Sequence, residues 1–498
     1  MMPRHREGLC PRVVGLLTLA CLLAGCAAAG SAQHPLPRSS PGSALVQQMR
    51  FSPLQLTIPR VGREVQRRVL PNGMTLYLAS DRSLPVINAY AVFRAGSLYE
   101  EEPSMPGVAQ FVAALLRAGG TAALSSEALN QELEMLGVSI ESAVFSETLS
   151  VTLSALAKDS DRALQLFADM VQRPAFELRS LETYRGRVIE DLRRVADTPS
   201  RLASQEYARI LYTESYPLGR PLTPIQARAI QREDLVTYHQ RLVRPDNLFM
   251  AVVGDFGVEE LRAKVEAQFG DWAVAGPLDL PSLPKVEPRS QRGVYTLARD
   301  LAQSNVILGH FGINRANPDR YAIQLMDIIL GGGSFTSRIM ERVRSEEGLA
   351  YSVASSFPTS TRDIGLFRVT VQTKNENVPR AVRAILEEMR RLQEHRVTPG
   401  ELDGAKDSLV NSFVFRFSSR FSTVTQLLTL EVDGYPSDYY ETLLDRYRAV
   451  TVEDIQRVAV RYLRPDAATV IAVGDVSKFE AALEAFGPLH HLPAPTIE

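Results

Sequence analysis

Apolar and polar residues alternate in several short stretches of the first half of the chain, and in longer stretches they recur with a helical period. Alternation at 65–70 and 74–78 flanks Asn72-Gly73 and predicts a hairpin, because Asn-Gly readily adopts the positive φ angles of a type I′ turn. Further strands are predicted at 87–93, 138–145 and 148–155, and helices at about 106–117, 126–136, 160–172 and 177–195. This half is therefore expected to intermix strands with long helices.

The second half repeats these patterns. Arg244-Pro245-Asp246 recurs as Arg464-Pro465-Asp466, and Val253-Gly254-Asp255 recurs as Val473-Gly474-Asp475, each 220 residues later. Each Arg-Pro-Asp is expected to turn the chain into a buried strand, at 248–253 or 468–473, which a helix follows at 258–269 or 478–486. Other strands are predicted near 304–311, 351–356 and 366–373, and helices near 319–330, 336–346, 377–394 and 399–415. The sequence thus predicts two related modules.

A linker is predicted between the modules at 276–292, where four prolines occur without an apolar period. Hairpins among long helices favour an α+β fold with largely antiparallel sheets. We therefore predict an N-terminal domain at 56–275, a C-terminal domain at 293–489 and a tail at 490–498. At 498 residues, with 45% hydrophobic and 22% charged residues, the chain has the composition of a soluble protein of more than one domain.

The N-terminus has the features of a secretory signal. An apolar run at 13–23 follows three arginines and is shorter than the ~20 residues that span a bilayer. It ends at Leu23-Ala24-Gly25-Cys26, which resembles a bacterial lipobox and implies cleavage after residue 25 and a lipid on Cys26. The alternative is a plain secretory signal with a chance cysteine near its cleavage site. Residues 26–55 are small, polar and proline-bearing, and are expected to form a flexible tether.

This N-terminus predicts a lipoprotein of the bacterial cell envelope that faces the periplasm. Ala27 and Ala28 follow the cysteine, with no aspartate at the second position, which favours the outer membrane. Removal of residues 1–25 takes away three arginines and Glu7, so the formal net charge changes from −2 to −4 and offers no footprint for nucleic acid. Cys10 and Cys21 lie in the removed segment, so no thiol remains for a disulfide or a thiolate metal site.

Three short motifs frame the predicted helix at 106–117: Ala95-Gly96-Ser97-Leu98-Tyr99-Glu100 before it, the run 107–114 within it, and Gly119-Gly120-Thr121 after it. The frame resembles the inverted zinc signature of the M16 (pitrilysin/insulinase-like) peptidases. In that signature, His-x-x-Glu-His supplies two imidazole ligands and a carboxylate that takes a proton from bound water. Here these positions hold Gln110, Ala113 and Ala114. The resemblance therefore implies a peptidase homologue that is inactive alone, with two α+β domains that form half of a clam shell.

The remaining candidate ligands do not restore a metal site. In the resembling family, a glutamate about 76 residues beyond the second histidine completes the zinc site, which corresponds here to Glu190. A lone carboxylate does not hold zinc, and Glu190 taken by itself is an ordinary exposed helix residue. The histidines of the body stand alone, except His490-His491, which we expect to be solvated, with adventitious metal binding as the alternative. No metal is assigned to this chain.

A second motif lies in the C-terminal module, where Gly331-Gly332-Gly333-Ser334 precedes Arg344 and Tyr351. It resembles the family motif whose Arg/Tyr pair, seven residues apart, reaches across the cavity to the substrate carbonyl, and whose glycine-rich segment is a flexible lining of the cavity entrance. Guanidinium and phenol donors suit an oxygen that gains negative charge. The alternative is that Arg344 pairs with a neighbouring glutamate on a helix surface and Tyr351 merely begins a strand. The glycines lack the Lys-Ser/Thr ending of a phosphate-binding loop.

Two functions follow from these observations. The first is a non-catalytic subunit of a heterodimeric M16B-type zinc metallopeptidase, in which a zinc-bearing subunit is the partner, a peptide is the substrate and this chain contributes Arg344 and Tyr351 in trans. The second is a peptide-binding or scaffold protein of the cell envelope without proteolytic activity. An enzyme with unrelated chemistry has little support, because the sequence contains neither a nucleophile elbow nor a CxxC pair.

Overall fold

The computed structural model describes residues 60–100, 106–274, 276–282, 285–288, 292–333 and 336–493. The predicted signal segment, the lipidation site Cys26 and the tether lie outside these ranges. Among the described residues, no helix is both long enough and apolar enough to cross a bilayer.

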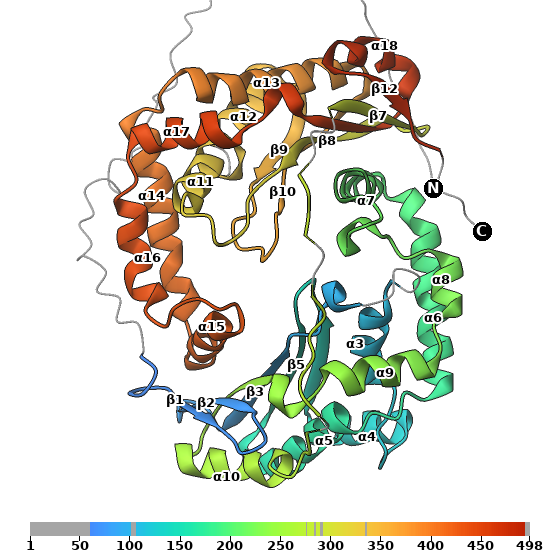
Figure 1. Cartoon of the computed structure of the whole chain (residues 1–498), viewed down its shortest axis with the longest axis vertical. Helices are drawn as coiled ribbons and strands as arrows, with labels where there is room; N and C mark the ends of the chain where they lie inside the picture. Colours follow the sequence, from blue (N-terminus) through green and yellow to red (C-terminus); the bar gives the residue numbers. More distant parts are fainter. Residues whose placement is uncertain are drawn as a thin grey trace, which may run out of the picture. The chain divides into compact units, whose positions relative to one another are not determined.

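Six strands form the first sheet in the order β1-β2-β6-β3-β5-β4. Strands β1, β2, β3 and β5 are labelled in the lower part of Figure 1. Neighbouring strands run antiparallel except β2 and β6, which are parallel. Strand β6 is buried along nearly its whole length, as expected for a strand covered on both faces. The bounds are β1 Gln66–Val69, β2 Thr75–Ser80, β3 Val86–Phe93, β4 Ser139–Val144, β5 Leu149–Leu156 and β6 Leu248–Gly254.

Six further strands form the second sheet in the order β12-β7-β11-β8-β10-β9, with parallel pairs at β12–β7 and β7–β11. The bounds are β7 Gly293–Ala298, β8 Gln303–Phe311, β9 Ala350–Ser356, β10 Leu366–Lys374, β11 Thr469–Gly474 and β12 Leu489–His491. Strand β11 has the position in this sheet that β6 has in the first. The predicted α+β fold with two related, largely antiparallel sheets is thereby confirmed.

The two sheets differ at one edge. In the first sheet the edge strand β1 comes from the hairpin with β2, whereas in the second sheet the edge strand β12 comes from the end of the chain. Strand β12 includes His490 and His491, two residues that we assigned to the tail. The His490 ring stacks on Tyr295 with 4.8 Å between ring centroids, and His491 Nδ1 lies 3.0 Å from a Glu480 carboxylate oxygen. Both histidines are exposed, and each has a contact within the second sheet or beside it.

The hairpin of β1 and β2 forms as predicted, but its turn is of another type. The Gly73 amide donates to the Leu70 carbonyl at 2.9 Å, so the turn spans Leu70 to Gly73 and has Pro71 as its second residue. Within this turn, only Gly73 has a positive φ, of 87°, whereas a type I′ turn requires a positive φ at both central residues. Pro71 prevents type I′ because its ring fixes φ near −65°, the value of a type I turn. Gly73 then takes the left-handed position after that turn.

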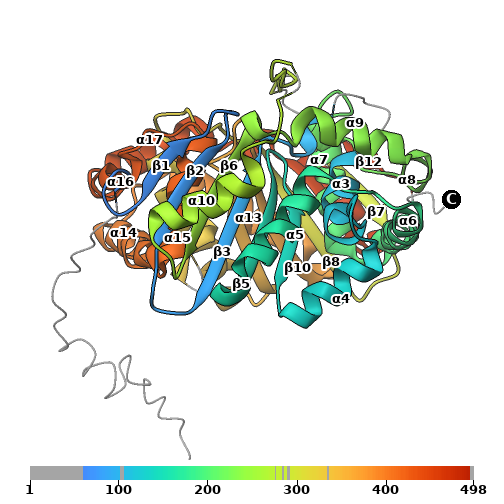
Figure 2. The same cartoon turned by 90° about the horizontal axis from the view of Figure 1, so that it is seen from below.

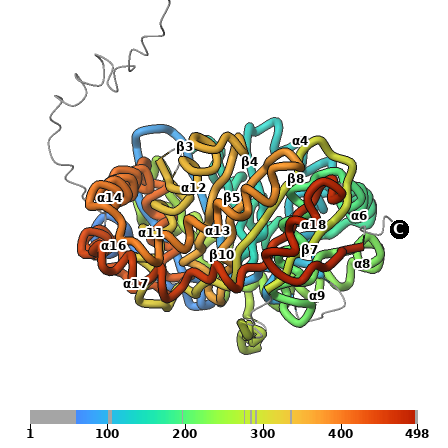
Figure 3. The backbone as a smooth tube through the Cα atoms, turned by 90° about the horizontal axis from the view of Figure 1, so that it is seen from above, coloured from blue at the N-terminus to red at the C-terminus, as the bar shows by residue number. Residues whose placement is uncertain are grey.

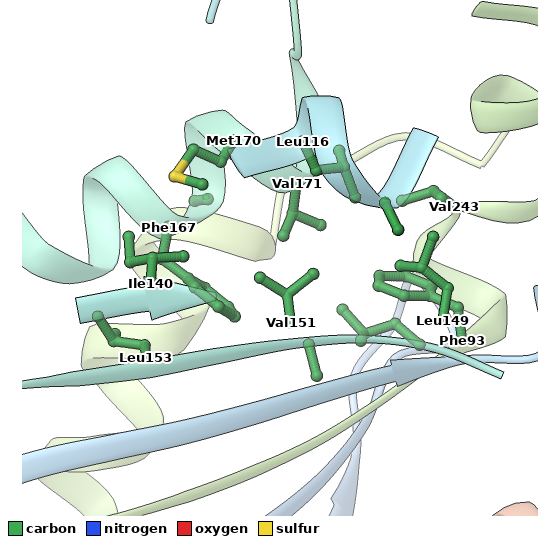
Figure 4. Close-up of a cluster of buried hydrophobic side chains, with 14 of the residues drawn as sticks. Phe93, Leu116, Ile140, Leu149, Val151, Leu153, Phe167, Met170, Val171 and Val243 are labelled. Atoms are coloured by element: carbon green, nitrogen blue, oxygen red, sulfur yellow. The ribbon is translucent and has the colours of Figure 1, made fainter. Parts of the chain in front are cut away.

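Amphipathic helices cover one face of the first sheet. Figure 2 shows α5 (Ser160–Gln172) and α10 (Val258–Phe269) over the strands, and α3 (Val108–Ala118) packs against β4. The side chains between them form the large cluster drawn in Figure 4, in which Phe167 of α5 and Phe93 of β3 are fully buried. This half also contains α4 Ser126–Leu136, α6 Leu178–Arg193, α8 Pro224–Ala229 and α9 Arg232–Leu242. Helix α6 packs on α3 and thereby lies beside the candidate site.

The second sheet is covered by α13 (Val378–Glu394), which packs on β8 and β10. Helices α14 (Pro399–Phe413) and α16 (Tyr439–Arg448) lie side by side in both Figure 1 and Figure 3. Two of the predicted helices end as π-helical turns, because α11 runs into η6 and α12 runs into η8. The remaining bounds are α11 Arg320–Asp327, η6 Ile328–Gly332, α12 Arg338–Met340, η8 Glu341–Glu346, α17 Val452–Tyr462 and α18 Glu480–Leu483.

Two helices that the sequence analysis did not predict are exchanged between the halves. Helix α7 (Pro199–Tyr212), from the first half, packs on β8 and β11 of the second sheet, and α15 (Arg420–Val432), from the second half, packs on β6 and β2 of the first sheet. The Tyr207 phenol of α7 is buried and donates to the Phe367 carbonyl at 2.6 Å. Glu431 of α15 accepts a bidentate pair of bonds from Arg67 at 2.7 and 2.6 Å. Each sheet is therefore covered on its second face by a helix from the other half.

Candidate functional site

Helix α3 carries the positions where the resembling signature has its histidines and glutamate. Its apolar face is buried, as Phe111 and Leu115 show, and Gln110 lies on the exposed face. The helix begins after Gly107, whose amide donates to the Glu100 carboxylate at 3.1 Å, and the Ala109 amide donates to the same carboxylate at 2.9 Å. A carboxylate in this place satisfies orphan amides of the first turn and complements the helix dipole.

Gln110 is held by a neighbouring helix. Its side-chain amide donates to the Tyr184 hydroxyl of α6 at 3.2 Å, and the Tyr184 ring meets Phe111 edge-on with centroids 5.0 Å apart. Desolvation raises the pKa of Tyr184 above its ordinary value, against the opposing effect of the Gln110 bond. At the signature positions one turn further on, Ala113 is buried and Ala114 is half-buried. An amide and two methyl groups thus stand where two imidazoles and a carboxylate would be required.

Glu190 lies near the end of α6 and is engaged elsewhere. It is exposed and forms an ion pair with Arg194 at 2.9 Å. Six residues of α-helix separate it from Tyr184, which corresponds to a rotation of roughly 240°, so the two side chains leave the helix on different faces. Asp191, seven residues after Tyr184, returns to the face of Tyr184, and its charge acts on that phenol. Neither Tyr184 nor Asp191 was among the predicted site residues, and the helical period measured from Tyr184 is the signal that identifies Asp191.

These residues do not fit a zinc ion. Neutral amide and methyl groups replace the three functional side chains of the signature, and the arginine beside Glu190 already supplies a positive charge. Within the described part of the chain, no group of three or more His, Cys, Asp or Glu residues could hold a metal. The buried histidines His239 and His310 each bond to backbone groups, His239 to the Val171 carbonyl at 2.7 Å and His310 to the Phe311 carbonyl at 2.8 Å.

An open polar groove lies beside this helix pair, between α4 and α6. Its volume is about 710 Å³, within the range of ligand sites. Glu127 and Glu134 of α4 line one wall, Arg179 and Arg187 of α6 line the other, and Tyr184 lies at the α6 side. The face that carries Gln110 is thus bordered by a groove with charges of both signs.

Arg344 and Tyr351 are brought together at the edge of the second sheet. The guanidinium carbon of Arg344, in η8, lies 5.0 Å from the centre of the Tyr351 ring, within the range of a cation–π contact. Two of the neighbouring glutamates pair with another arginine, since Arg342 pairs with Glu347 at 2.8 Å and with Glu346 at 3.5 Å. The structure therefore places the two predicted residues in contact with each other, in η8 and β9, whereas Gln110 and Glu190 lie on helices α3 and α6 of the first half.

The backbone of β9 directs Tyr351 outward. In the β9–β10 ladder, Gln372 pairs with Ser352 and Thr373 pairs with Ala350, so Tyr351 is the extra residue of a β-bulge. Bulges commonly re-aim a side chain beside a functional site. Tyr351 is 84% exposed, which is unusual for an aromatic residue within a strand. The sequence could not show the bulge, because the bulge depends on the register with β10.

The glycine-rich segment differs from the flexible lining that we expected. Residues Ile328–Gly332 form a π-helical turn, and Gly331 is buried against β9. A Cβ atom on Gly331 would lie 2.7 Å from Ser355 Oγ, so only glycine allows this approach. Asp327 fastens the turn to β9, because its carboxylate accepts bonds from the Ser355 hydroxyl at 2.5 Å and the Phe357 amide at 3.0 Å. Ser334 lies outside the described residues.

Two family models match the chain. Residues 78–223 match the model described as insulinase (peptidase family M16), and residues 229–409 match the model described as the peptidase M16 inactive domain. A solved structure described as a peptidase M16 inactive domain from Pseudomonas fluorescens is 26% identical, with a TM-score of 0.75 over 82% of this chain and 97% of its own. A solved protease from Helicobacter pylori is 18% identical, with a TM-score of 0.71 over 82% of this chain and 99% of its own, a likeness that shows the fold alone.

The curated relatives have names of two kinds. An uncharacterised zinc protease of Streptomyces coelicolor is 24% identical over 403 residues, which cover 79% of this chain and 86% of the relative. A protein of Helicobacter pylori named as a non-peptidase homologue is 25% identical over 380 residues, which cover 75% of this chain and 85% of the relative. The chain is therefore similar both to proteins named as peptidases and to one named as lacking that activity.

Proposed function

Because this chain belongs to the M16 peptidase family, we propose that it is a non-catalytic subunit of a heterodimeric M16B-type zinc metallopeptidase. The observation that supports this proposal is the contrast between its two motifs. At Gln110, Ala113 and Ala114 the groups that bind a metal and activate water are replaced, whereas Arg344 and Tyr351 remain together and Tyr351 is exposed on a bulge. A protein without any peptidase role has no evident need for an outward-facing arginine–tyrosine pair.

In this proposal the zinc ion and the carboxylate base belong to a partner subunit that carries an intact His-x-x-Glu-His. This chain contributes two hydrogen-bond donors to the carbonyl oxygen of the bound peptide. The stacking of Arg344 on the Tyr351 ring orients both side chains before the peptide arrives, so little ordering remains for the reaction itself. Donors at an oxygen that gains negative charge stabilise the transition state more than the bound peptide, and each contributes about 3 kcal/mol in comparable sites.

We further propose that the complex is held at the periplasmic face of a bacterial envelope by a lipid on Cys26. The support is the Leu23-Ala24-Gly25-Cys26 sequence after an apolar run, and the absence of aspartate after the cysteine favours the outer membrane. Unfolded or short peptides released in that compartment are the substrates that this arrangement suits.

We expect the isolated chain to contain no stoichiometric zinc. The purified protein is dialysed against a limited excess of zinc, passed through a desalting column and measured by metal analysis. A matched variant that restores the signature, Gln110→His with Ala113→Glu and Ala114→His, shows whether the fold still accepts the metal. One tightly held zinc per wild-type chain, together with peptide cleavage by that chain alone, would refute the assignment.

Substitution of the Arg/Tyr pair tests the proposal in the assembled enzyme. Arg344→Ala and Tyr351→Phe are each expected to lower the turnover of a complex with a zinc-bearing subunit by about a hundredfold, because each removes one donor to the developing oxyanion. Association of the subunits, measured by sedimentation, is expected to stay unchanged. Arg342→Ala is the control, since Arg342 lies two residues away and pairs with Glu347. Turnover that falls equally in the control and the test variants would contradict the proposed role.

The second candidate is a peptide-binding or scaffold protein of the envelope. The observation that favours it is the groove of about 710 Å³ near Gln110. One wall of this groove is acidic and the other is basic, so the groove suits the binding of a peptide rather than its hydrolysis. This candidate predicts peptide binding by the isolated chain and no dependence of any cleavage on Arg344 or Tyr351. The turnover experiment therefore separates the two candidates.

A further inference from the structure

A second and smaller pocket lies on the second sheet, on the face that α7 covers. Its volume is about 230 Å³. We call it the amide pocket and define it by its six polar residues, which are Ser200, Ser204, Asn305, Ser352, Thr370 and Gln372. Three of these residues form one row across the strands, because Gln372 of β10 is the register partner of both Asn305 in β8 and Ser352 in β9. Their side chains leave the sheet on one face.

One wall of the amide pocket is helix α7, and this wall is fixed to the sheet. The Tyr207 phenol donates to the Phe367 carbonyl at 2.6 Å, and the Tyr212 phenol donates to the Ile364 carbonyl at 2.9 Å. Below the helix, its apolar side chains pack on Ile307 and Ile471. Ser200 and Ser204 lie one turn apart near the start of this helix and face the row of polar residues. The pocket is therefore preformed.

The lining of the amide pocket is uncharged but rich in hydrogen-bonding groups. Asn305 and Gln372 each offer an amide that donates and accepts, and Ser352 offers a hydroxyl. Among the described residues, these three side chains have no hydrogen-bond partner within the protein. The charged residues of β10, Arg368 and Lys374, lie one step outside the pocket on the same face of the strand. A ligand group that both donates and accepts hydrogen bonds fits this lining, whereas a cation would face two cations.

The amide pocket and Tyr351 of the Arg/Tyr pair share strand β9. Ser352 lines the pocket, and the next residue toward the N-terminus is Tyr351, the extra residue of the β-bulge. A peptide whose carbonyl reaches Tyr351 would thus have a side chain at the mouth of the pocket, since one residue of extended chain covers about 3.3 Å. We propose that the amide pocket is a subsite for an uncharged polar side chain of the peptide, above all glutamine or asparagine. The place of the subsite along the bound peptide rests on the proposed function, whereas its preference for an uncharged polar side chain rests on the lining of the pocket alone.

Binding to the intact chain tests the subsite without a partner subunit. Four fluorescent decapeptides are compared that differ at one central position, which is glutamine, leucine, lysine or glutamate, and dissociation constants are measured by fluorescence anisotropy. We expect the glutamine peptide to bind about fivefold more tightly than the leucine and lysine peptides, because only glutamine pairs with the partnerless amides. If the glutamate peptide bound most tightly, Arg368 and Lys374 rather than the amides would set the preference, and the proposal would fail.

A near-isosteric charge change gives the sharper test. In Gln372→Glu, the lysine peptide is expected to become the tightest of the four, about fivefold tighter than the glutamine peptide, because a carboxylate now faces the bound side chain. The matched control is Gln268→Glu in α10, which adds the same charge to the first half of the chain and is expected to keep the wild-type order. An order of affinities in Gln372→Glu that equals the order in Gln268→Glu would overturn the subsite.

The two proposals fail in different experiments. If the order of affinities holds but Arg344→Ala leaves turnover of the complex unchanged, the amide pocket stands and the role of the Arg/Tyr pair falls. If Arg344→Ala lowers turnover but all four peptides bind equally, the role of the pair stands and the amide pocket falls.

Discussion

Acidification from pH 7 to pH 4 is expected to remove roughly 3 kcal/mol of the free energy of unfolding through each of two buried histidines, His239 and His310. Burial lowers the pKa of each imidazole from 6.5 to about 4. The unfolded chain therefore takes up protons as the pH falls below 6.5, while the folded chain does not until about pH 4. The stabilisation is complete above pH 6.5 and is lost across this window.

The contacts of His310 explain why its neutral form is required. Its Nδ1 donates to the Phe311 carbonyl at 2.8 Å, and its Nε2 accepts the Arg464 amide at 3.0 Å. A second proton on Nε2 would remove the acceptor and place a cation inside the second sheet. Arg464 begins the turn that leads into β11, so the neutral imidazole fixes the start of a central strand.

The measurement compares variants rather than the wild type alone, because other groups titrate in the same window. Desolvation raises the pKa of Glu100 to about 7, and this carboxyl group acts in the opposite sense. Urea unfolding is followed at pH 7, 5.5 and 4 for the wild type, His239→Gln and His310→Gln. The advantage of the wild type over each variant is expected to shrink by roughly 3 kcal/mol from pH 7 to pH 4. The exposed His395→Gln is the matched control, and an advantage independent of pH would contradict the prediction.

Removal of the Tyr207 side chain is expected to lower the free energy of unfolding by about 3 to 5 kcal/mol, the usual cost of truncating a large buried aromatic residue. Tyr207 is fully buried between α7 and the second sheet, where it packs with Leu202, Ile307 and Ile471. Its hydroxyl also donates to the Phe367 carbonyl at 2.6 Å. Tyr207→Ala therefore loses apolar contacts and the hydrogen bond to the Phe367 carbonyl.

A second variant separates these two losses. Tyr207→Phe keeps the ring and removes the hydroxyl, and is expected to cost about 0.5 to 1.5 kcal/mol for the lost hydrogen bond. Tyr351→Ala truncates a tyrosine that is 84% exposed and is expected to change stability by less than about 0.5 kcal/mol. Urea unfolding followed by circular dichroism gives all three values. A cost for Tyr207→Ala no greater than that for Tyr351→Ala would show that α7 contributes little to the second half.

The sequence predicted elements well where one face of a short segment determines its structure. The strand predicted at 87–93 is β3, Val86–Phe93, and the helix predicted at 160–172 is α5, Ser160–Gln172. Helices α7 and α15 were not predicted, and the local pattern could not show that each packs on the sheet of the other half. The turn type at Asn72-Gly73 failed because the adjacent proline dominates the backbone geometry.

The sequence predicted which residues belong to the two motifs, but not the backbone geometry and the pocket around them. The interpretation of Gln110, Ala113 and Ala114 as unable to form a zinc site rests on side-chain chemistry alone, and it stays a prediction for the zinc measurement to test. The choice of Glu190 depended on an approximate count of residues, and on a helix an error of one residue turns the side chain by about 100°. The bulge at Tyr351 and the amide pocket arise from strand register and from a helix distant in sequence, which no local pattern encodes.

The exchange of α7 and α15 has a consequence for how such a gene can change. The unit that was duplicated in the sequence differs from the unit that folds, because a copy excised at the linker would carry one helix that belongs on its neighbour and would lack its own. Recombination that shuffles single repeats between relatives would therefore expose bare apolar sheet surfaces. Only the two repeats together form a unit that can fold after transfer to another gene.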